Sequence, residues 1–210
     1  MYVFFVFRFK KVRRGPSMQE KKRCEWVSDQ PLYIEYHDKE WGRETRDSLR
    51  LFEMLCLEGQ QAGLSWWLIL QRRENYRQVF ADFNPHVLAG YDDRELSRLL
   101  EYEGIIRNKL KIKSIINNAK AYLRIEEGGR SFSDYIWEFT DGQIITNCFR
   151  DASEVPSESL ISQKMSRQLK KDGFSFVGPT ICYAYMQAVG MVNDHTSRCF
   201  LYPGKKTKEQ

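Results

Sequence analysis

Apolar side chains recur at helical spacing along most of the chain. Leu51, Phe52, Leu55 and Cys56 fall on one helical face, because residues three and four apart lie together on a helix surface. The same spacing predicts helices over residues 64–80, 96–100, 112–122, 132–139, 157–171 and 179–190, with a short one opening at 84–85. Strands and helices do not alternate, and we expect residues 140–156 to be mostly loop. The pattern therefore predicts an all-α fold in one compact unit.

Polar residues and glycines mark the ends of these predicted helices. Asp47 can cap the helix that carries Leu51, and Asp92 with Glu95 resembles a capping box. Pro85 suits a first helical turn, and the Gly128–Gly129 pair is typical of a helix end. Local signals thus agree with the apolar pattern about where the helices begin and end.

The composition is that of a globular protein, with 42% hydrophobic and 29% charged residues among 210. It excludes the disordered, collagen-like and disulfide-rich classes. No apolar run approaches the roughly 18 residues that a membrane span needs. A net charge of +5 suggests nucleic acid as a partner, but residues 1–23 carry +7 and residues 204–210 carry +2, so the body between them carries −4. The overall charge is therefore no evidence for DNA binding by the folded part.

The first 17 residues differ from the rest of the chain. Their apolar residues precede the charges, which is the reverse of a signal peptide, and the stretch is too short for firm attachment to a membrane surface. Met18 is a plausible true start. We expect residues 1–17 to be a disordered or adventitious extension, residues 18–203 a single helical domain, and residues 204–210 a basic tail.

Five cysteines, an odd number without a secretory signal, indicate free thiols or metal ligands in a reducing compartment, which predicts a cytoplasmic protein. Cys24 and His37 lie near the start of the predicted domain, and His195 and Cys199 lie near its end. Two Cys with two His form a favoured tetrahedral zinc set with no position open for water, so such a site would be structural. The alternative is that all four are packing residues.

A helix followed by a glycine-flanked turn and a second helix is predicted over residues 160–190. The turn runs from Gly173 through Phe174 and Val177 to Gly178, after a helix with basic residues such as Lys170. Glycines let a backbone approach phosphate, and the second helix offers unpaired N–H groups. The alternative is a plain helical turn with a solvated basic face. A second basic stripe follows Gly104 and consists of Arg107, Lys109, Lys111 and Lys113.

Aromatic residues crowd around the first pair of candidate ligands. Trp26, Tyr33, Tyr36 and Trp41 lie within sixteen residues, and Glu58 ends an apolar helix shortly before Trp66. A carboxylate beside electron-rich rings suits a flat, cationic or N–H-rich ligand. The alternative is that the rings are core residues and that Glu58 bonds a backbone N–H or an arginine.

Several longer motifs make a specific resemblance. They are Cys24–Trp26, Pro31–Gly42, Leu51–Trp66, Arg73–Tyr76, Gly104–Arg107, Phe174–Tyr183 and Val192–His195. Together these motifs resemble the DNA-3-methyladenine glycosylase I family, the constitutive alkyladenine glycosylases of the helix-hairpin-helix superfamily. The resemblance covers residues 18–203 and leaves residues 1–17 outside it.

The resemblance implies a helix-hairpin-helix glycosylase fold with structural Zn²⁺ on Cys24, His37, His195 and Cys199. It implies a base pocket in which Glu58 is the catalytic residue and which is lined by Trp26, Tyr36, Trp41 and Trp66, to which the aromatic cluster adds Tyr33. Contact with DNA is assigned to Gly63 and Leu64, beside the gap left by the flipped nucleotide, and to Lys170, Gly173, Phe174, Val177 and Gly178. Asp194 either corresponds to the catalytic Asp of related glycosylases or orients His195; we favour the second.

The family implies a hydrolase that flips 3-methyladenine out of alkylated double-stranded DNA and cuts its N-glycosidic bond, leaving an abasic site without a lyase step. We expect a monomer with no nucleotide cofactor and no membrane partner. The alternative is a non-catalytic module that only binds damaged DNA, although such a module has no use for a base pocket.

Overall fold

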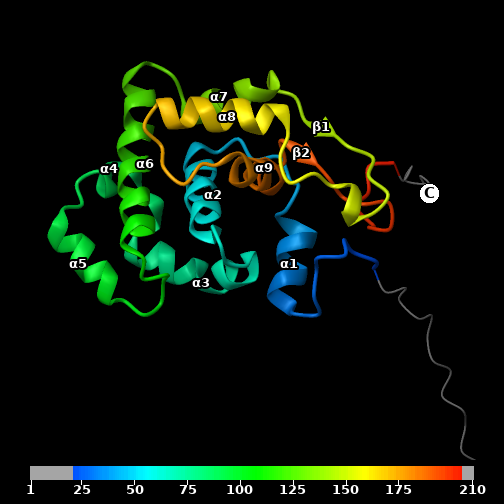
Figure 1. Ribbon diagram of the computed structural model, residues 1–210, viewed down its shortest axis with the longest axis horizontal. Coiled ribbons are helices and arrows are strands. Elements are labelled where there is room, and N and C mark those ends of the chain that lie inside the picture. Colours follow the sequence, from blue (N-terminus) through cyan, green and yellow to red (C-terminus); the bar gives the residue numbers. More distant parts are fainter. Residues whose placement is uncertain (1–20, 205–210) are drawn as a thin grey trace, which may run out of the picture.

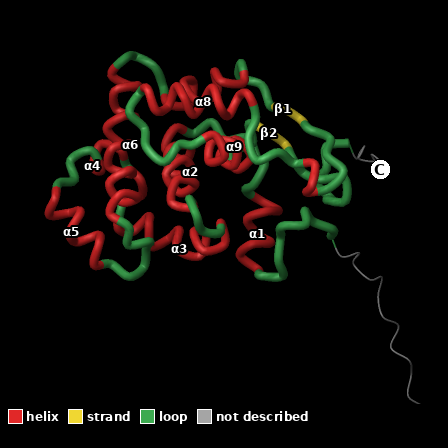
Figure 2. Tube along the Cα trace, in the orientation of Figure 1, coloured by secondary structure: helices red, strands yellow, loops and turns green. Residues whose placement is uncertain are grey.

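The computed structural model describes residues 21–204. The predicted extension over residues 1–17 and nearly all of the predicted tail lie outside the described residues. Helices dominate the described part (Figures 1 and 2). The longer ones are α1 (Pro31–Lys39), α2 (Ser48–Gln61), α3 (Trp66–Val79), α5 (Asp93–Glu101), α6 (Lys109–Glu127), α8 (Leu160–Lys171) and α9 (Pro179–Ala188), with α4 (Pro85–Leu88) and α7 (Phe132–Trp137) shorter. None of the described helices is long and apolar enough to cross a membrane.

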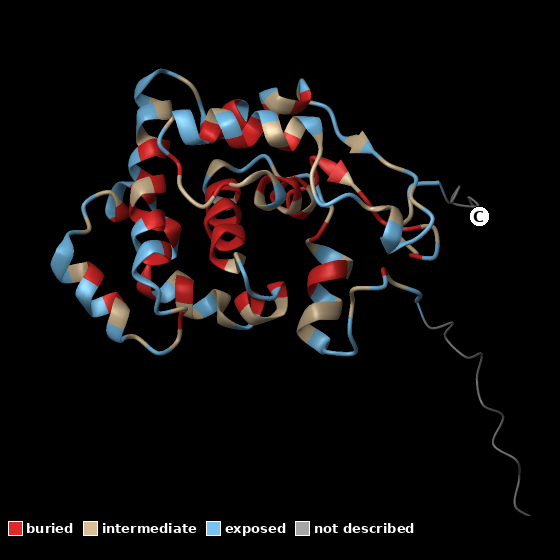
Figure 3. Cartoon of the chain, in the orientation of Figure 1, coloured by how far each residue is buried: buried red, intermediate tan, exposed pale blue. Residues whose placement is uncertain are grey.

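Helix α2 forms the centre of the core. Every residue from Leu51 to Gln60 is buried, and α2 packs against α3, α6, α7 and α9 (Figure 3). Its predicted start is confirmed, since the Asp47 side chain accepts a hydrogen bond from the N–H of Arg50 at 2.8 Å. Because α2 is surrounded on all sides, any polar side chain on it must find a partner or face a cavity.

The described chain is mostly helical, as the all-α prediction has it, with one short pair of strands in addition. Strand β1 (Ile145–Thr146), which lies in the segment that we expected to be mostly loop, pairs in parallel with β2 (Val192–Asn193), which follows α9. Two residues carry too little alternation to predict a strand. Three short 3-10 turns, η1 (Ala81–Phe83), η2 (Glu138–Thr140) and η3 (Ala152–Glu154), complete the set. The pairing places the segment after α9 beside the segment before α8.

Candidate active site

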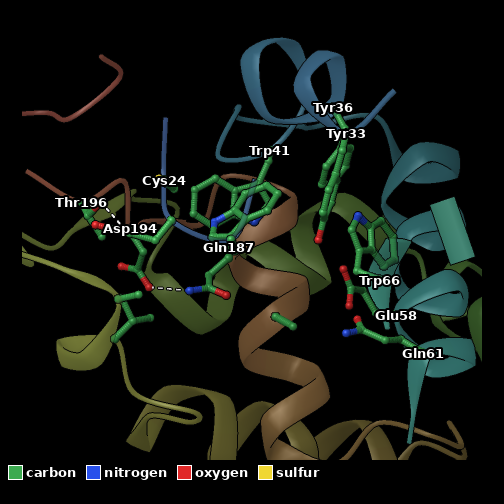
Figure 4. A pocket seen from close by; sticks show the side chains of 15 residues that line it. Cys24, Tyr33, Tyr36, Trp41, Glu58, Gln61, Trp66, Gln187, Asp194 and Thr196 are labelled. Atoms are coloured by element: carbon green, nitrogen blue, oxygen red, sulfur yellow. Dashed lines mark hydrogen bonds between the residues drawn. The ribbon is translucent and has the colours of Figure 1, made fainter. Parts of the chain in front are cut away.

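A cavity of about 340 Å³ opens between α1, the C-terminal end of α2, the start of α3 and one side of α9 (Figure 4). All six residues predicted for the base pocket line it, namely Trp26, Tyr33, Tyr36, Trp41, Glu58 and Trp66. The sequence prediction brought together residues up to 40 positions apart, and the structure places them around one space.

Short helices bring the aromatic rings to this cavity. Helix α1 carries Tyr33 and Tyr36 one turn apart, and the ring of Tyr36 lies 5.3 Å from that of Trp66. Trp66 opens α3 directly after Ser65, whose hydroxyl caps that helix. On the other side, the ring of Trp26 meets that of Trp41 at 5.0 Å, edge to face. The cavity wall is thus a set of mutually packed rings, which holds its shape without a ligand.

Glu58 is the charged residue at the ring-lined end of the cavity. It is 3% exposed, and among residues 21–204 no donor reaches its Oε2. Burial raises the pKa of this carboxyl to about 8, so its buried position favours the neutral form. The indole Nε1 of Trp66 is likewise buried without a partner in the described chain. The acceptor Oε2 of Glu58 and the donor Nε1 of Trp66 can therefore both bind a polar ligand in this cavity.

The two tyrosines of α1 remain neutral hydroxyls. Burial first and the charge of Glu58 second raise the pKa of Tyr36 well above its ordinary value, and the same causes raise that of Tyr33. Each hydroxyl therefore keeps its proton for hydrogen bonding. Figure 4 shows both rings standing on the side of the cavity that Glu58 and Trp66 also occupy.

Sequence reasoning missed Gln187 and Thr196 on the opposite wall of the cavity and singled out Asp194 only for other roles. Gln187 projects from α9, and Thr196 and Asp194 come from the segment that follows β2 (Figure 4). Gln61, Ala152, Val155 and Ala184 add to the lining. The motif Phe174–Tyr183 pointed to α9, but no local signal marks Gln187, which is the only wall residue of α9 with a polar side chain in the described lining.

The preferred role for Asp194 is wrong in its detail. Its carboxylate accepts hydrogen bonds from Tyr183 Oη and Gln187 Nε2, both at 2.7 Å, and from Asn147 Nδ2 at 2.8 Å. His195 is not among these donors; its Nδ1 lies 3.0 Å from Oδ1 of Asn193. Asp194 therefore organises a polar network on the cavity wall and does not hold the imidazole of His195.

Three of the four predicted zinc ligands come together. The ligand atoms of Cys24, His37 and Cys199 all lie within 4.8 Å of one another, and all three residues are buried. His37 Nε2 lies 3.4 Å from the Cys199 sulfur, while its Nδ1 bonds Asp38 at 2.8 Å. A carboxylate on the far nitrogen is the usual support of a metal-bound histidine.

His195, the fourth predicted ligand, lies outside that group of three. Its ring nevertheless packs 5.2 Å from the ring of His37, and its buried Nε2 has no partner in the described chain. Burial lowers the pKa of His195 to about 4, which leaves a neutral imidazole. Gly42 is required here, because a Cβ at that position would come within 2.7 Å of the imidazole.

The hydrogen bond between the two thiols of this cluster shifts their pKa values in opposite directions, so that one sulfur keeps its proton and the other loses it. The hydrogen bond from Cys24 is the largest cause that lowers the pKa of Cys199, to about 4, while the same contact raises that of Cys24. A buried thiolate beside an imidazole nitrogen is the donor chemistry that Zn²⁺ prefers. The residues present therefore fit a metal ion.

The predicted DNA-contacting turn connects α8 to α9. Phe174 and Val177 are 3% and 1% exposed, so contacts from these two positions would have to come from the backbone. Asn118 of α6 holds the turn from inside, since it donates to the carbonyl of Ser175 at 3.2 Å and accepts from its N–H at 2.8 Å. Lys170 and Gly173 are exposed at the end of α8. The conformation of the turn is therefore fixed from inside, and its backbone groups are the ones available for contact with DNA.

The second basic stripe is only partly a surface feature. Lys111 is 6% exposed, and its Nζ donates to the carbonyls of Gln60 at 2.6 Å and Ala62 at 2.8 Å. It therefore pins the end of α2 and does not face solvent as predicted. The next residues are Gly63, which has φ +72°, and Leu64, which is 38% exposed. A left-handed glycine here lets the chain turn outward and present Leu64.

Comparisons with known proteins agree with this geometry. The methyladenine glycosylase family matches residues 26–202. DNA-3-methyladenine glycosylase 1 of Escherichia coli is 51% identical over 185 residues, which covers 88% of this chain and 99% of that protein. DNA-3-methyladenine glycosylase of Haemophilus influenzae is 47% identical, covering 84% of this chain and 96% of that protein.

Solved structures show the same likeness in three dimensions. A crystal structure of a 3-methyladenine DNA glycosylase I matches with a TM-score of 0.86 and 50% identity, covering 87% of this chain and all of that one. A Staphylococcus aureus enzyme, solved to explain how it recognises 3-methyladenine, matches with a TM-score of 0.84 and 33% identity, covering 88% of this chain and 98% of that one.

Proposed function

This chain belongs to the methyladenine glycosylase family, and we propose that it acts through the ring-lined cavity that Glu58 closes. It is a DNA repair glycosylase, a hydrolase that excises 3-methyladenine. The observation that carries the assignment of the site is the unpaired, buried Oε2 of Glu58 beside packed aromatic rings.

A base methylated at N3 is a flat cation, and its glycosidic bond is already weak. The protein must therefore extrude the nucleotide, at a cost of roughly a few kcal/mol, and hold the base while water attacks the sugar. Trp66 and Tyr36 would stack on the base and favour its charge through cation–π attraction. Glu58 would accept hydrogen bonds from the N–H groups at the base edge. Neutral adenine gains less from every one of these contacts.

The raised pKa of Glu58 makes the carboxyl responsive to its ligand. In the empty cavity the proton is retained near neutral pH, because burial disfavours the charge. Entry of a cation favours the carboxylate, and the proton leaves to solvent. Water then forms a bond to the sugar carbon as the base leaves with the bonding electrons, and the water gives up one proton to solvent, so the methylated base departs neutral and the sugar is left abasic. No acid is needed to protonate the leaving group.

DNA would be held by two features that flank the cavity. We assign backbone contacts to the turn over residues 173–178 after Lys170, in the manner of a helix-hairpin-helix element. Leu64, presented by Gly63, would fill the space that the flipped nucleotide vacates. Both assignments rest on exposure and backbone geometry.

We assign structural Zn²⁺ to Cys24, His37 and Cys199, with His195 as the fourth ligand. The thiolate of Cys199, the neutral imidazole of His195 with its unpaired Nε2, and the three ligand atoms gathered within 4.8 Å support the assignment. When bound, zinc would join the two ends of the domain and perform no chemistry on the substrate. None of the five cysteines, all of which lie in the described part of the chain, forms a disulfide, which supports our placement of the protein in the cytoplasm, where we expect it to be a monomer.

Base release tests this proposal directly. Purified protein is incubated with alkylated duplex DNA, and free 3-methyladenine is measured for the native chain and for Glu58→Gln. We expect release by the native chain and a loss of at least about a hundredfold in the variant, because an amide cannot take the negative charge that pairs with the cation. Glu74→Gln, which changes an exposed carboxylate away from the cavity, is the control. Equal rates for Glu58→Gln and the native chain would refute the assignment of the site.

A further inference from the structure

Gln187 and Asp194 form a unit on the cavity wall that the proposed function does not use. Gln187 is half-buried in the lining, and its Nε2 donates to Asp194 Oδ2 at 2.7 Å. An ionised carboxylate only accepts hydrogen bonds, so it dictates which end of the amide turns toward it. The amide nitrogen of Gln187 must face Asp194, and its oxygen must face away.

The free oxygen of this amide lies on the cavity side. Figure 4 shows Gln187 with its nitrogen toward Asp194 and its oxygen on the other side, in the direction of Glu58. Among residues 21–204, no donor reaches Gln187 Oε1. Glu58 on α2 and the oxygen of Gln187 on α9 therefore offer acceptors to the cavity from two different elements.

Asp194 is held as firmly as the amide that it orients. It is 2% exposed and also accepts from Tyr183 at 2.7 Å and from Asn147 at 2.8 Å. Burial and the hydrogen bond to Asp194 raise the pKa of Tyr183, so that hydroxyl remains the donor. Because three donors converge on one carboxylate, its orientation is fixed, and so is that of the Gln187 amide.

We propose that Gln187 is a second recognition residue of the base cavity, whose amide oxygen contacts the cationic base across from Glu58, and that Asp194 is the positioning residue that keeps this oxygen turned inward. The inference rests on the proposed function of the cavity. The negative end of a fixed dipole stabilises a cation without a burial cost at the moment of binding. Had the amide the opposite orientation, its N–H groups would repel the same base.

The test is a double-mutant cycle with Gln187→Leu, Asp194→Asn and the pair. Single-turnover release of 3-methyladenine is expected to fall about ten- to a hundredfold in Gln187→Leu, which is the value of a hydrogen bond to a charged partner. Asp194→Asn is expected to cost about tenfold, because an Asn amide lets Gln187 turn over. In the Gln187→Leu background the same change should add less than about twofold, since Asp194 acts through Gln187.

Two further measurements separate recognition from structure. Affinity for duplex DNA with a tetrahydrofuran abasic site should stay within about twofold in every variant, because no base enters the cavity. Tyr183→Phe removes a donor to the same oxygen of Asp194 but lies outside the cavity lining, so it is expected to cost less than about threefold. Zinc content is measured throughout, because His195 neighbours Asp194 in sequence.

The outcomes are distinct. Native release rates in Gln187→Leu, or full additivity of the two single changes, would overturn the inference while Glu58→Gln remains inactive and the proposed function stands. Native release in Glu58→Gln would remove the proposed site itself. Loss of zinc or of abasic-site affinity in Gln187→Leu would also overturn the inference, because the residue would then be structural.

Discussion

Glu58 and Asp194 line one cavity and are both almost fully buried, at 3% and 2% exposure. Asp194 accepts hydrogen bonds from three side chains, whereas Oε2 of Glu58 has no donor within the described chain. Burial alone raises the pKa of Glu58 to about 8. The hydrogen bonds of Asp194 are made within the protein, so this carboxylate stabilises the fold. Glu58 lacks such bonds, so its carboxyl is available to a ligand. The difference separates a positioning residue from a recognition residue in the same space.

The two walls also depend on different parts of the molecule. Glu58 lies on α2, inside the core, whereas Asp194 lies between β2 and His195, next to the cluster of Cys24, His37 and Cys199. If that cluster holds zinc, the Asp194 wall depends on the metal and the Glu58 wall does not. Four predictions test this contrast, beginning with the largest expected effect.

Removal of the metal should loosen the Asp194 wall first. A cross-link that closes a loop of this length is worth roughly 4–5 kcal/mol, which corresponds to roughly 10 °C or more in the midpoint of unfolding. We expect chelation and Cys199→Ser each to lower the midpoint by that amount and to increase amide exchange over residues 192–199 before α2. Cys148→Ser is the control, because Cys148 is an exposed free thiol outside the cluster. An unchanged midpoint after chelation would exclude a structural metal.

Truncation of the two carboxylates should affect stability differently. Asp194→Ala leaves three donors unpaired and is expected to cost about 3 kcal/mol of unfolding free energy. Glu58→Gln removes a group that is costly to bury and should be neutral or stabilising. Urea unfolding at pH 7 measures both. A large destabilisation by Glu58→Gln would mean that the carboxyl has a structural partner after all.

The contribution of Glu58 to the pH dependence of stability should appear as the difference between the native chain and Glu58→Gln. Its folded pKa, about 8, lies above the ordinary value of 4.5, so the folded state holds the proton more tightly than the unfolded chain does. Stability from this group is therefore fully present below pH 4.5 and is lost as the pH rises through 8. Denaturant unfolding between pH 5 and 9 should show the unfolding free energy of the native chain falling relative to that of Glu58→Gln as the pH rises. Parallel profiles would contradict it.

The contrast also explains what could be predicted from the sequence. The pocket residues from Trp26 to Trp66 could be predicted because they lie in long family motifs. Helices such as α2 could be predicted because apolar residues recur along one face. Helix α1 was not predicted, because its polar and aromatic residues carry no clear stripe. Such a helix is recognised only from what it packs against, and here that is the cavity and the metal cluster.

The hydrogen-bond partners of buried polar side chains could not be predicted, because the tertiary structure decides them. Asp194 adjoins His195 in sequence but bonds Tyr183, Gln187 and Asn147. Lys111 belongs to a run of basic residues, yet it turns inward. In each case the side chain takes the nearest buried groups that lack a hydrogen bond, and those groups belong to segments remote in sequence.

The smallest expected effect concerns how Glu58 stays in place without a bond of its own. Lys111 Nζ donates to the carbonyls of Gln60 and Ala62, so it fixes the end of α2 just beyond Glu58 and just before Leu64. Lys111→Met keeps the length of the side chain but leaves both carbonyls unpaired, while it relieves the burial of a charge, so the net cost is about 1 kcal/mol. We expect base release to fall a few-fold.

Lys113→Met is the matched control for that change. Lys113 is exposed on the same helix, so its loss removes the same charge without freeing the end of α2. If both lysines acted only through charge, the two variants would lower the salt-dependent affinity for DNA equally and would not differ in any other measurement. Only Lys111→Met should reduce unfolding free energy and single-turnover release, which denaturant unfolding and the release assay measure. Equal losses of release in the two variants would mean that the position of Glu58 does not depend on this anchor.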